Sequence, residues 1–304
     1  MMPKCAMFFT VILSLQIAGA ADFQKTYDDA ANRRITIGTL HGDIKLSGYD
    51  GKTIEISAEK KGADREQVII EDVGFGNQIH LFARYLEPAR TDATVDFEIR
   101  VPKEIFLDAS SGAKPQGGPF QRFPVAKPGP PGTQVPSISP GSPPGGGHAS
   151  YAIYLKSSSG QITVSDVAGS IRVETGARDI ELQNVDGRLY VSSGSGDIRG
   201  LLKQVSPRGM MQFSSISGSI LLQAPDNISA QVYIQSASGQ VKTDFPLETK
   251  AMRYGPGKFI QGKLGDGNQR LDIRSVSGAI NFSKNAPEEK EYKGETPEKL
   301  STFD

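Results

Sequence analysis

The feature that most constrains this chain is a nine-residue spacing of apolar pairs in its second half. The pairs are Ile153/Leu155, Ile162/Val164, Ile171/Val173, Ile180/Leu182 and Leu189/Val191, with Ile198 next in the series. Two apolar residues separated by one residue lie on the same face of a strand, so each unit predicts one short half-buried strand and one turn. A glycine stands two residues before most of these pairs, where we expect the positive φ that tight turns require. These glycines are Gly160, Gly169, Gly187 and Gly196.

A second, doubled period indicates how these strands assemble. SDVAGSIRV from Ser165 aligns with QNVDGRLYV from Gln183, which places Asp166 over Asn184. One coil would then hold two strands, and stacked coils would pair equivalent strands in parallel at about 4.8 Å. The expected interior rows are Ile153, Ile171 and Leu189, and Ile162, Ile180 and Ile198. We therefore predict an all-β chain that forms a parallel β-solenoid (β-helix-like) of about 18–22 residues per coil.

The pattern extends to both sides of this segment. After Gly200 the turn phrases SISGSI (215–220), SASGQV (236–241) and SVSGAI (275–280) recur in coils of about twenty residues or more. Earlier in the chain, Ile35/Ile37, Ile44/Leu46 and Ile54/Ile56 repeat the apolar pairs. Residues 67–71, 78–83 and 94–101 alternate as longer strands, which suggests a cap that contains a hairpin.

Three segments fall outside the repeat. Residues 1–20 have the order of a secretory signal peptide, with cleavage expected between Ala20 and Ala21. Their apolar run is shorter than the roughly 20 residues that a membrane span needs. Residues 112–150 are dominated by Pro and Gly, which predicts a disordered Pro/Gly-rich insertion or, alternatively, a Pro-rich ligand for a partner domain. The composition of residues 284–304 predicts a charged disordered tail. The remaining predicted segments are N-terminal β-strand repeats and a cap at 21–111 and a β-solenoid repeat domain at 151–283.

Composition narrows the classes of function. The 34 basic and 34 acidic residues cancel, so no net field would attract nucleic acid or an anionic membrane surface. The only cysteine, Cys5, lies in the signal segment, so the mature chain would have no thiol for a disulfide, a zinc site or catalysis. His41, His80 and His148 are far apart, and none has a second ligand at metal spacing. We expect no metal and no cofactor.

Recurrent SGDI-type phrases carry a family resemblance. They are GDI at Gly42, SGQI at Ser159, SGDI at Ser195, SGSI at Ser217 and SGAI at Ser277, joined by RVPK at Arg100, TDFPL at Thr243 and GKLGDG at Gly262. In this order, from about Arg33 to Phe282, they resemble the bacterial "putative adhesin" family, a β-strand repeat-containing family of unknown function. The resemblance implies an envelope-associated or secreted β-solenoid and carries over no catalytic residues. The Pro/Gly-rich insertion departs from the family pattern.

One pair of carboxylates is a candidate for catalysis. Asp179 and Asp197 are separated by one doubled period, so adjacent coils would place them about one strand spacing from each other. Clustered carboxylates in a groove are what a polysaccharide lyase or hydrolase of β-helix type requires. An Asp before a strand also supports its turn through side-chain to backbone hydrogen bonds. We interpret the pair as turn support and keep polysaccharide cleavage as the alternative.

A column of outward residues is the expected binding surface. Steps of one doubled period place Tyr154, Arg172 and Tyr190 on one solvent-facing column. They could form a cation–π ladder, or a flat polar-aromatic surface for a glycan or an envelope protein. The alternative is that these residues only keep the sheet soluble and in register.

The sequence thus predicts an exported, non-enzymatic, adhesin-like protein that serves as a binding or structural module at the cell envelope. Its place would be the periplasm, the cell surface or the medium, with no transmembrane segment in the mature chain and no nucleic-acid partner. The alternatives are a polysaccharide lyase or hydrolase and an envelope-stress regulatory protein.

Overall fold

The structure, a computed structural model, describes residues 21–28, 30, 33–86, 92–105, 151–203, 209–251 and 257–285. The described residues up to 178 form one compact unit, unit 1, and those from 179 onward form unit 2. The regular elements in these ranges are β-strands and short 3-10 turns such as Arg65–Gln67, so this part of the chain is all-β as predicted. The expected signal peptide and its cleavage after Ala20, and the expected insertion at 112–150, lie outside the described residues.

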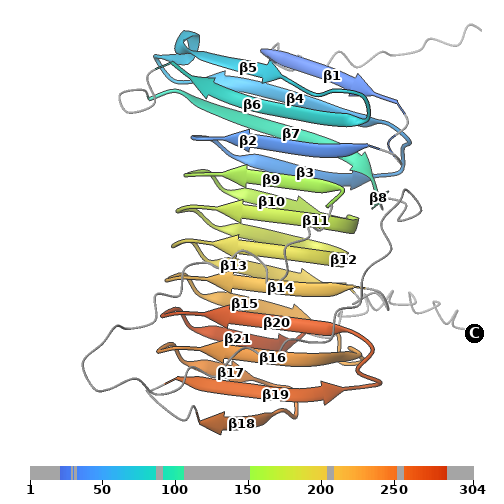
Figure 1. The fold of residues 1–304 in the computed structure, drawn as a ribbon, viewed down its shortest axis with the longest axis vertical. Coiled ribbons are helices and arrows are strands. Elements are labelled where there is room, and N and C mark those ends of the chain that lie inside the picture. Colours follow the sequence, from blue (N-terminus) through green and yellow to red (C-terminus); the bar gives the residue numbers. More distant parts are fainter. Residues whose placement is uncertain are drawn as a thin grey trace, which may run out of the picture. The chain divides into compact units, whose positions relative to one another are not determined.

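Unit 1 consists of two sheets, which we call sheet A and sheet B (Figure 1). In spatial order, sheet A contains β1 (Phe23–Tyr27), β4 (Ile54–Lys61), β7 (Thr94–Pro102), β3 (Ile44–Tyr49) and β10 (Ile162–Ser165). Sheet B contains β5 (Val68–Asp72), β6 (Gln78–Tyr85), β2 (Arg34–Thr39), β9 (Ile153–Ser157) and β11 (Ala168–Thr175), with β8 (Glu104–Ile105) beside the start of β11. The pairs β1–β4, β4–β7 and β5–β6 are antiparallel and the others are parallel. The strands β5 and β6 form the expected hairpin.

Equivalent strands of unit 1 lie in register although they are far apart in sequence. Ile153 lies beside Ile35 on one side and Ile171 on the other. In the other sheet, Ile162 lies beside Ile44. The coil of β2 and β3 therefore stacks directly on the coil of β9 and β10, and the predicted pairing of Ile153 with Ile171 is confirmed.

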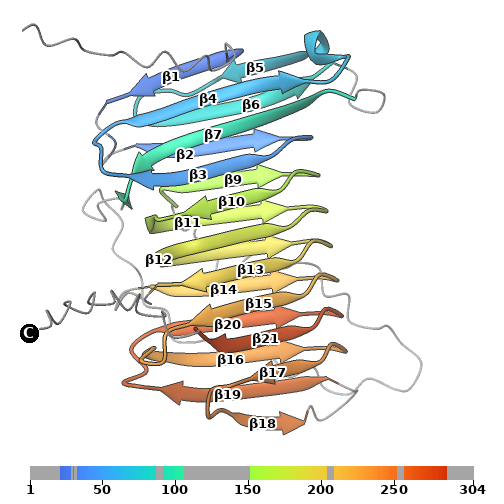
Figure 2. The ribbon, with the colours of Figure 1, turned by 180° about the vertical axis from the view of Figure 1, so that it is seen from behind.

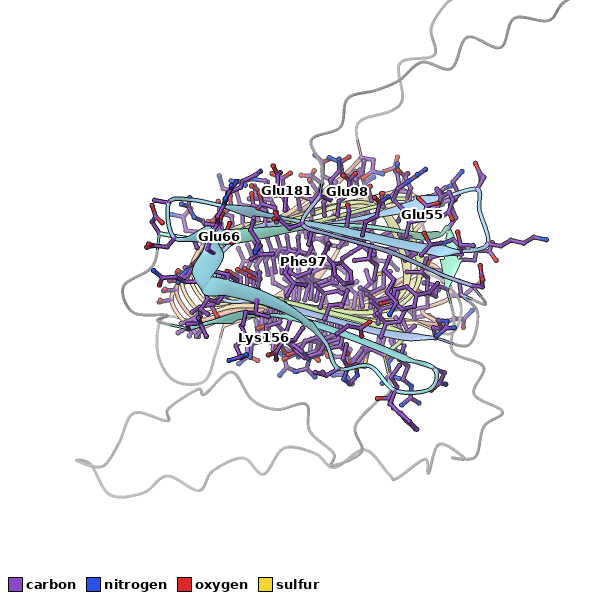
Figure 3. All side chains as sticks on the ribbon, turned by 90° about the horizontal axis from the view of Figure 1, so that it is seen from above. Glu55, Glu66, Phe97, Glu98, Lys156 and Glu181 are labelled. Atoms are coloured by element: carbon purple, nitrogen blue, oxygen red, sulfur yellow. The ribbon has the colours of Figure 1, made fainter. Side chains whose placement is uncertain are left out.

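Strand alternation sorts the side chains of unit 1 into a core and two outer faces. Phe97 points into the space between the two sheets, whereas Glu98 and Lys156 point away from it (Figure 3). Phe97 is 2% exposed, and the apolar pairs of β2, β3, β9 and β10 are fully buried around it. Because full burial of such side chains stabilises by about 1.5–3 kcal/mol each, this shared core is the main source of stability.

Unit 2 is built from two sheets in the same way (Figure 2). The long strand β12 (Ile180–Ser193) contributes its first half to one sheet of this unit, sheet A of unit 2, and its second half to the other, sheet B of unit 2. Sheet A of unit 2 also contains β13 (Ile198–Leu202), β15 (Ile220–Ala224), β21 (Ile280–Lys284) and β17 (Val241–Thr243). Sheet B of unit 2 also contains β14 (Met210–Ser215), β20 (Arg270–Ser275), β16 (Ala230–Ser236), β19 (Lys258–Leu264) and β18 (Glu248–Ala251).

The coils of unit 2 do not stack in chain order. β20 lies between β14 and β16, and β21 lies between β15 and β17, so the last coil is inserted between two earlier ones (Figure 2). The strands β16, β19 and β18 then pair antiparallel. Lys284 is still part of β21, and the Asn285 N–H donates to the carbonyl of Ala224 at 2.9 Å. The repeat therefore ends after the expected boundary at 283, and the rest of the expected tail lies outside the described residues.

The expected coil lengths occur within unit 2. Ile180 pairs with Ile198, which is the doubled period of the regular segment. Leu189 pairs with Met211, a longer step at the upper end of the expected range. Leu189 is buried, as predicted. It belongs to a different unit from Ile171, so the expected row of Ile153, Ile171 and Leu189 is confirmed for its first two members.

The turn glycines are required for a reason other than the expected one. Only Gly187 has a positive φ, of 102°, so the expectation is wrong for the other three glycines. The left-handed conformation occurs instead at Asp166 (56°) and Asn184 (53°), and such short polar residues tolerate it. At Gly160 an added Cβ would lie 1.6 Å from the carbonyl oxygen of Gly42 in the neighbouring coil. Close stacking of the two backbones therefore requires glycine at this position.

Candidate functional site

The outer face of sheet B in unit 1 carries a tyrosine–arginine–glutamate cluster. Ile153 and Leu155 face the core, so alternation turns Tyr154 outward, where it lies beside Arg172 of β11. The guanidinium carbon of Arg172 lies 5.3 Å from the centroid of the Tyr154 ring. The Tyr154 hydroxyl donates to the Glu174 carboxylate at 2.7 Å, and Arg172 Nε donates to the same carboxylate at 2.8 Å. A cation–π contact and charge-assisted hydrogen bonds thus hold the three side chains in one arrangement.

The cluster continues across sheet B into strands that are distant in sequence. Thr36 of β2 lies beside Tyr154, and His80 of β6 lies beside Thr36. Two residues further along, Phe82 lies against Gly38, where an added Cβ would come within 2.7 Å of the Phe82 ring. These neighbours were not predicted from the sequence, because no chain period links β2 and β6 to β9. The alternation of Ile35 and Ile37 is the sequence signal that could have predicted that Thr36 faces outward.

Tyr190 does not extend the exposed column. It is 6% exposed and lies in unit 2 beside Gln212 of β14. The prediction of a solvent-facing column is therefore wrong for Tyr190, while Tyr154 and Arg172 are neighbours as predicted. Alternation turns a side chain away from the core, but neighbouring groups can still cover it, and a sequence period does not reveal such cover.

Unit 2 carries a second cluster of similar composition on the outer face of its sheet B. Asp272 of β20 lies between Gln212 and Tyr233. Arg270 Nε donates to Asp272 at 3.0 Å, and its guanidinium carbon lies 4.7 Å from the Tyr233 centroid. The Asp272 side chain is 3% exposed, so its charge is held against the guanidinium groups of Arg270 and Arg274. This cluster was not predicted from the sequence, because the inserted β20 brings together residues that share no chain period.

Backbone amides and one arginine hold the candidate catalytic carboxylates. Asp179 accepts from the Asp197 N–H at 2.9 Å, and Asp197 accepts from the Ser219 N–H at 2.8 Å. Arg199 donates to Asp179 at 2.6 Å and to Asp197 at 2.9 Å. Each carboxylate thus has one oxygen bonded to the backbone of the next coil and the other bonded to Arg199. This arrangement supports the turns between coils, and it does not leave a carboxylate free to act as nucleophile or general base.

A polar hollow of about 520 Å³ lies at the same kind of turn in unit 1. It is lined by His41, Gly42, Asp43, Asp92, Ala93, Thr94, Asp96, Ser159, Gln161 and Arg178. Asp96 accepts from the Asp43 N–H and Asp43 accepts from the Gln161 N–H, both at 2.8 Å. The N–H groups of Asp64 and Ala63 hold the pKa of Asp92 below its usual value. Backbone support therefore occupies these carboxylates too, and the hollow offers mainly His41, Gln161 and Arg178 to a ligand.

The described ranges contain neither a metal-binding cluster nor a membrane-spanning helix. No three His, Cys, Asp or Glu side chains of the described residues are grouped so that they could hold a metal ion. His148 lies outside those residues. In the part of the chain that the structure describes, no helix has the length and apolar character needed to span a membrane.

The chain is similar to one protein family and to several solved structures. Residues 149–283 match the family model described as Toastrack DUF4097. A "putative cell adhesion protein" from Clostridium sporogenes is 10% identical, with 86% of this chain and 98% of that chain covered and a TM-score of 0.38. A "putative adhesin" from Bacteroides fragilis is 12% identical, with 85% and 96% covered and a TM-score of 0.28. A "putative adhesin" from Parabacteroides merdae is 11% identical, with 86% and 95% covered and a TM-score of 0.22. No curated protein matches the chain.

Proposed function

We propose that this chain, whose residues 149–283 match the family model described as Toastrack DUF4097, is an exported, non-enzymatic, adhesin-like β-solenoid that binds a polysaccharide of the cell envelope. The observation that carries the proposal is the cluster of Tyr154, Arg172 and Glu174 on the outer face of unit 1. Its side chains already hold one another in place, so these side chains would lose little conformational entropy when a ligand binds.

An extended polysaccharide suits this face better than a small molecule does. The face is one side of a sheet, and its row of Thr36, Tyr154 and Arg172 repeats polar and aromatic groups at the spacing of parallel strands, about 4.8 Å. A polymer that lies across the strands would meet one such group at each strand. Hydroxyl groups of the sugar would bond to the guanidinium and carboxylate, and the partly exposed tyrosine ring would supply apolar contact.

The first test removes the proposed binding group. Arg172→Ala is expected to weaken the affinity for purified envelope polysaccharide about tenfold or more, because a central arginine anchor carries much of the binding energy in such a face. Tyr154→Phe keeps the ring and removes the hydroxyl, and a smaller loss is expected. Titration calorimetry measures both, and thermal melts verify that the variants fold.

Lys45→Ala is the matched control, since Lys45 is exposed on sheet A of the same unit. It should bind like the unmodified chain. Unchanged affinity in Arg172→Ala, or an equal loss in Lys45→Ala, would contradict the proposed binding face. If the chain binds an envelope protein and no polysaccharide, the proposed ligand is wrong.

A second test addresses the enzyme alternative. The purified chain is expected to release no reducing or unsaturated ends from envelope polysaccharides. The double variant Asp179→Asn with Asp197→Asn should leave that result unchanged and lower the free energy of unfolding by about 0.5–2 kcal/mol, because Arg199 loses two exposed charged partners. Polysaccharide cleavage that disappears in the double variant would establish the enzyme and overturn the proposal.

A further inference from the structure

Exposed apolar side chains gather on one hairpin of unit 1. Eight large apolar residues of the described ranges are exposed, and five of them belong to the β5–β6 hairpin and its ends. These five, which we call the apolar stripe, are Ile69, Val73, Phe75, Phe82 and Leu86. Single exposed apolar residues are common on protein surfaces, but several on one hairpin indicate an interaction site. The ion pair between Glu71 and Arg84 lies among them on the same face.

Alternation places most of the stripe on one face of the hairpin. Val68 of β5 and Leu81 of β6 face the core, so Ile69 and Phe82 point outward. The Val73 N–H donates to the carbonyl of His80 at 2.9 Å, which extends the ladder and keeps Val73 on the same outer face. The Phe75 side chain lies at the turn and is 90% exposed.

The turn that carries Phe75 is held by hydrogen bonds at several points. Asp72 Oδ1 accepts from the Gly74 N–H at 3.1 Å, and the carbonyl of Phe75 accepts from the Gln78 N–H at 3.1 Å. Lys25 and Tyr27 also donate to Asp72, at 2.6 and 3.0 Å. Phe75 therefore extends from an ordered turn, and its exposed side chain adds almost no apolar burial to the fold.

Two arginines stand beside this turn. Arg33 donates to the carbonyl oxygens of Asp28 and Gly76, and Arg34 lies beside Gln78 at the start of β2. Among the described residues, neither guanidinium has a carboxylate within ion-pair distance. The full chain has no net charge. Attraction to an anionic surface would therefore be local to this turn.

We propose that the apolar stripe docks on an anionic lipid surface, with Phe75 and Val73 entering the headgroup region and Arg33 and Arg34 contacting lipid phosphates. Aromatic and aliphatic tips flanked by arginine suit the boundary between headgroups and acyl chains. A second copy of the chain fits less well. A two-fold contact through the turn would bring the arginines of both copies together, and pairing along the edge of β5 would leave the outer face uncovered. This inference does not depend on polysaccharide binding.

Co-sedimentation with lipid vesicles tests the proposal. The full-length chain is incubated with vesicles of phosphatidylcholine alone and with an equimolar mixture of phosphatidylcholine and phosphatidylglycerol. Phe75→Ser should lower the partition coefficient about tenfold on the mixed vesicles, as expected for the loss of one inserted aromatic side chain. Arg34→Gln should reduce the preference for the anionic vesicles about fivefold, whereas Arg34→Lys should retain it.

Leu221→Ser is the matched control, because Leu221 is an exposed apolar residue of unit 2. It should bind vesicles like the unmodified chain, and all variants keep the same N-terminal segment. Equal binding by the unmodified chain and Phe75→Ser, or an equal loss in Leu221→Ser, would overturn the proposal. Light scattering that shows a dimer, which Phe75→Ser converts to monomer, would overturn it in favour of a second copy.

Discussion

Gly278→Ala is expected to lower the free energy of unfolding of unit 2 by about 3 kcal/mol or more. An added Cβ at this position would lie 1.9 Å from the carbonyl oxygen of Gly218 in the neighbouring coil. The atom that it meets belongs to the backbone, so no side-chain rotation can relieve the clash, and the two coils must separate. Urea denaturation followed by circular dichroism measures the loss.

Ala279→Ser is the control for this prediction. It adds one heavy atom to the exposed neighbouring residue, and a change of less than about 0.5 kcal/mol is expected. Similar stability for Gly278→Ala and Ala279→Ser would show that the coils are not packed as closely as the structure describes.

Arg270→Met is expected to lower the free energy of unfolding by about 3 kcal/mol. Methionine keeps the apolar stem over the Tyr233 ring but removes the main charged partner of the Asp272 carboxylate, whose side chain is 3% exposed. Arg274 is 3.8 Å from the carboxylate and can compensate only in part. Chemical denaturation of the variant at neutral pH measures the effect.

A second substitution separates lost charge pairing from lost packing. Asp272→Asn in the Arg270→Met background should recover part of the stability, because it removes the buried charge that has no close partner. If the effects of the two substitutions simply add, the ion pair does not contribute and the prediction fails.

The positions of the strands could be predicted because they depend on local alternation. Pairs such as Ile153/Leu155 and Ile180/Leu182 are buried as expected, and neighbouring coils in the regular segment keep the doubled period. The role of the turn glycines could not be predicted. Their spacing suggests a turn, whereas the contact of Gly160 with Gly42 comes from a coil far away in the sequence.

The order of the later coils lies beyond what the repeat can tell. SISGSI, SASGQV and SVSGAI are nearly equivalent phrases, so each could stack on either of the others. β16 pairs on its far side with the antiparallel strand β19, which leaves its other side to β20. The choice therefore depends on the capping strands, whose pairing is not encoded in the turn phrases.

The candidate site was predictable only along one direction of the sheet. The doubled period placed Tyr154 beside Arg172 correctly. It could not reveal that Tyr190 is buried, because that depends on neighbouring groups that cover the side chain. It could not reveal the neighbours on β2 and β6 either, because those strands are distant in the sequence. The same limit hid the cluster around Asp272 in unit 2.

The cluster around Asp272 exists only if β20 lies between β14 and β16, and cysteine pairs test that order of the coils directly. Three variants are made in a chain with Cys5→Ser, each with two introduced cysteines. Mild oxidation should form a disulfide in the variant with Arg274→Cys and Ser214→Cys, and in the variant with Arg274→Cys and Gln235→Cys, since these positions are in register on adjacent strands. Ser214→Cys and Gln235→Cys should not join, because two strand spacings, about 9.6 Å, exceed the reach of a disulfide. Efficient joining of this last pair, with none to position 274, would show that the coils follow chain order and would contradict the stacking on which the cluster around Asp272 depends.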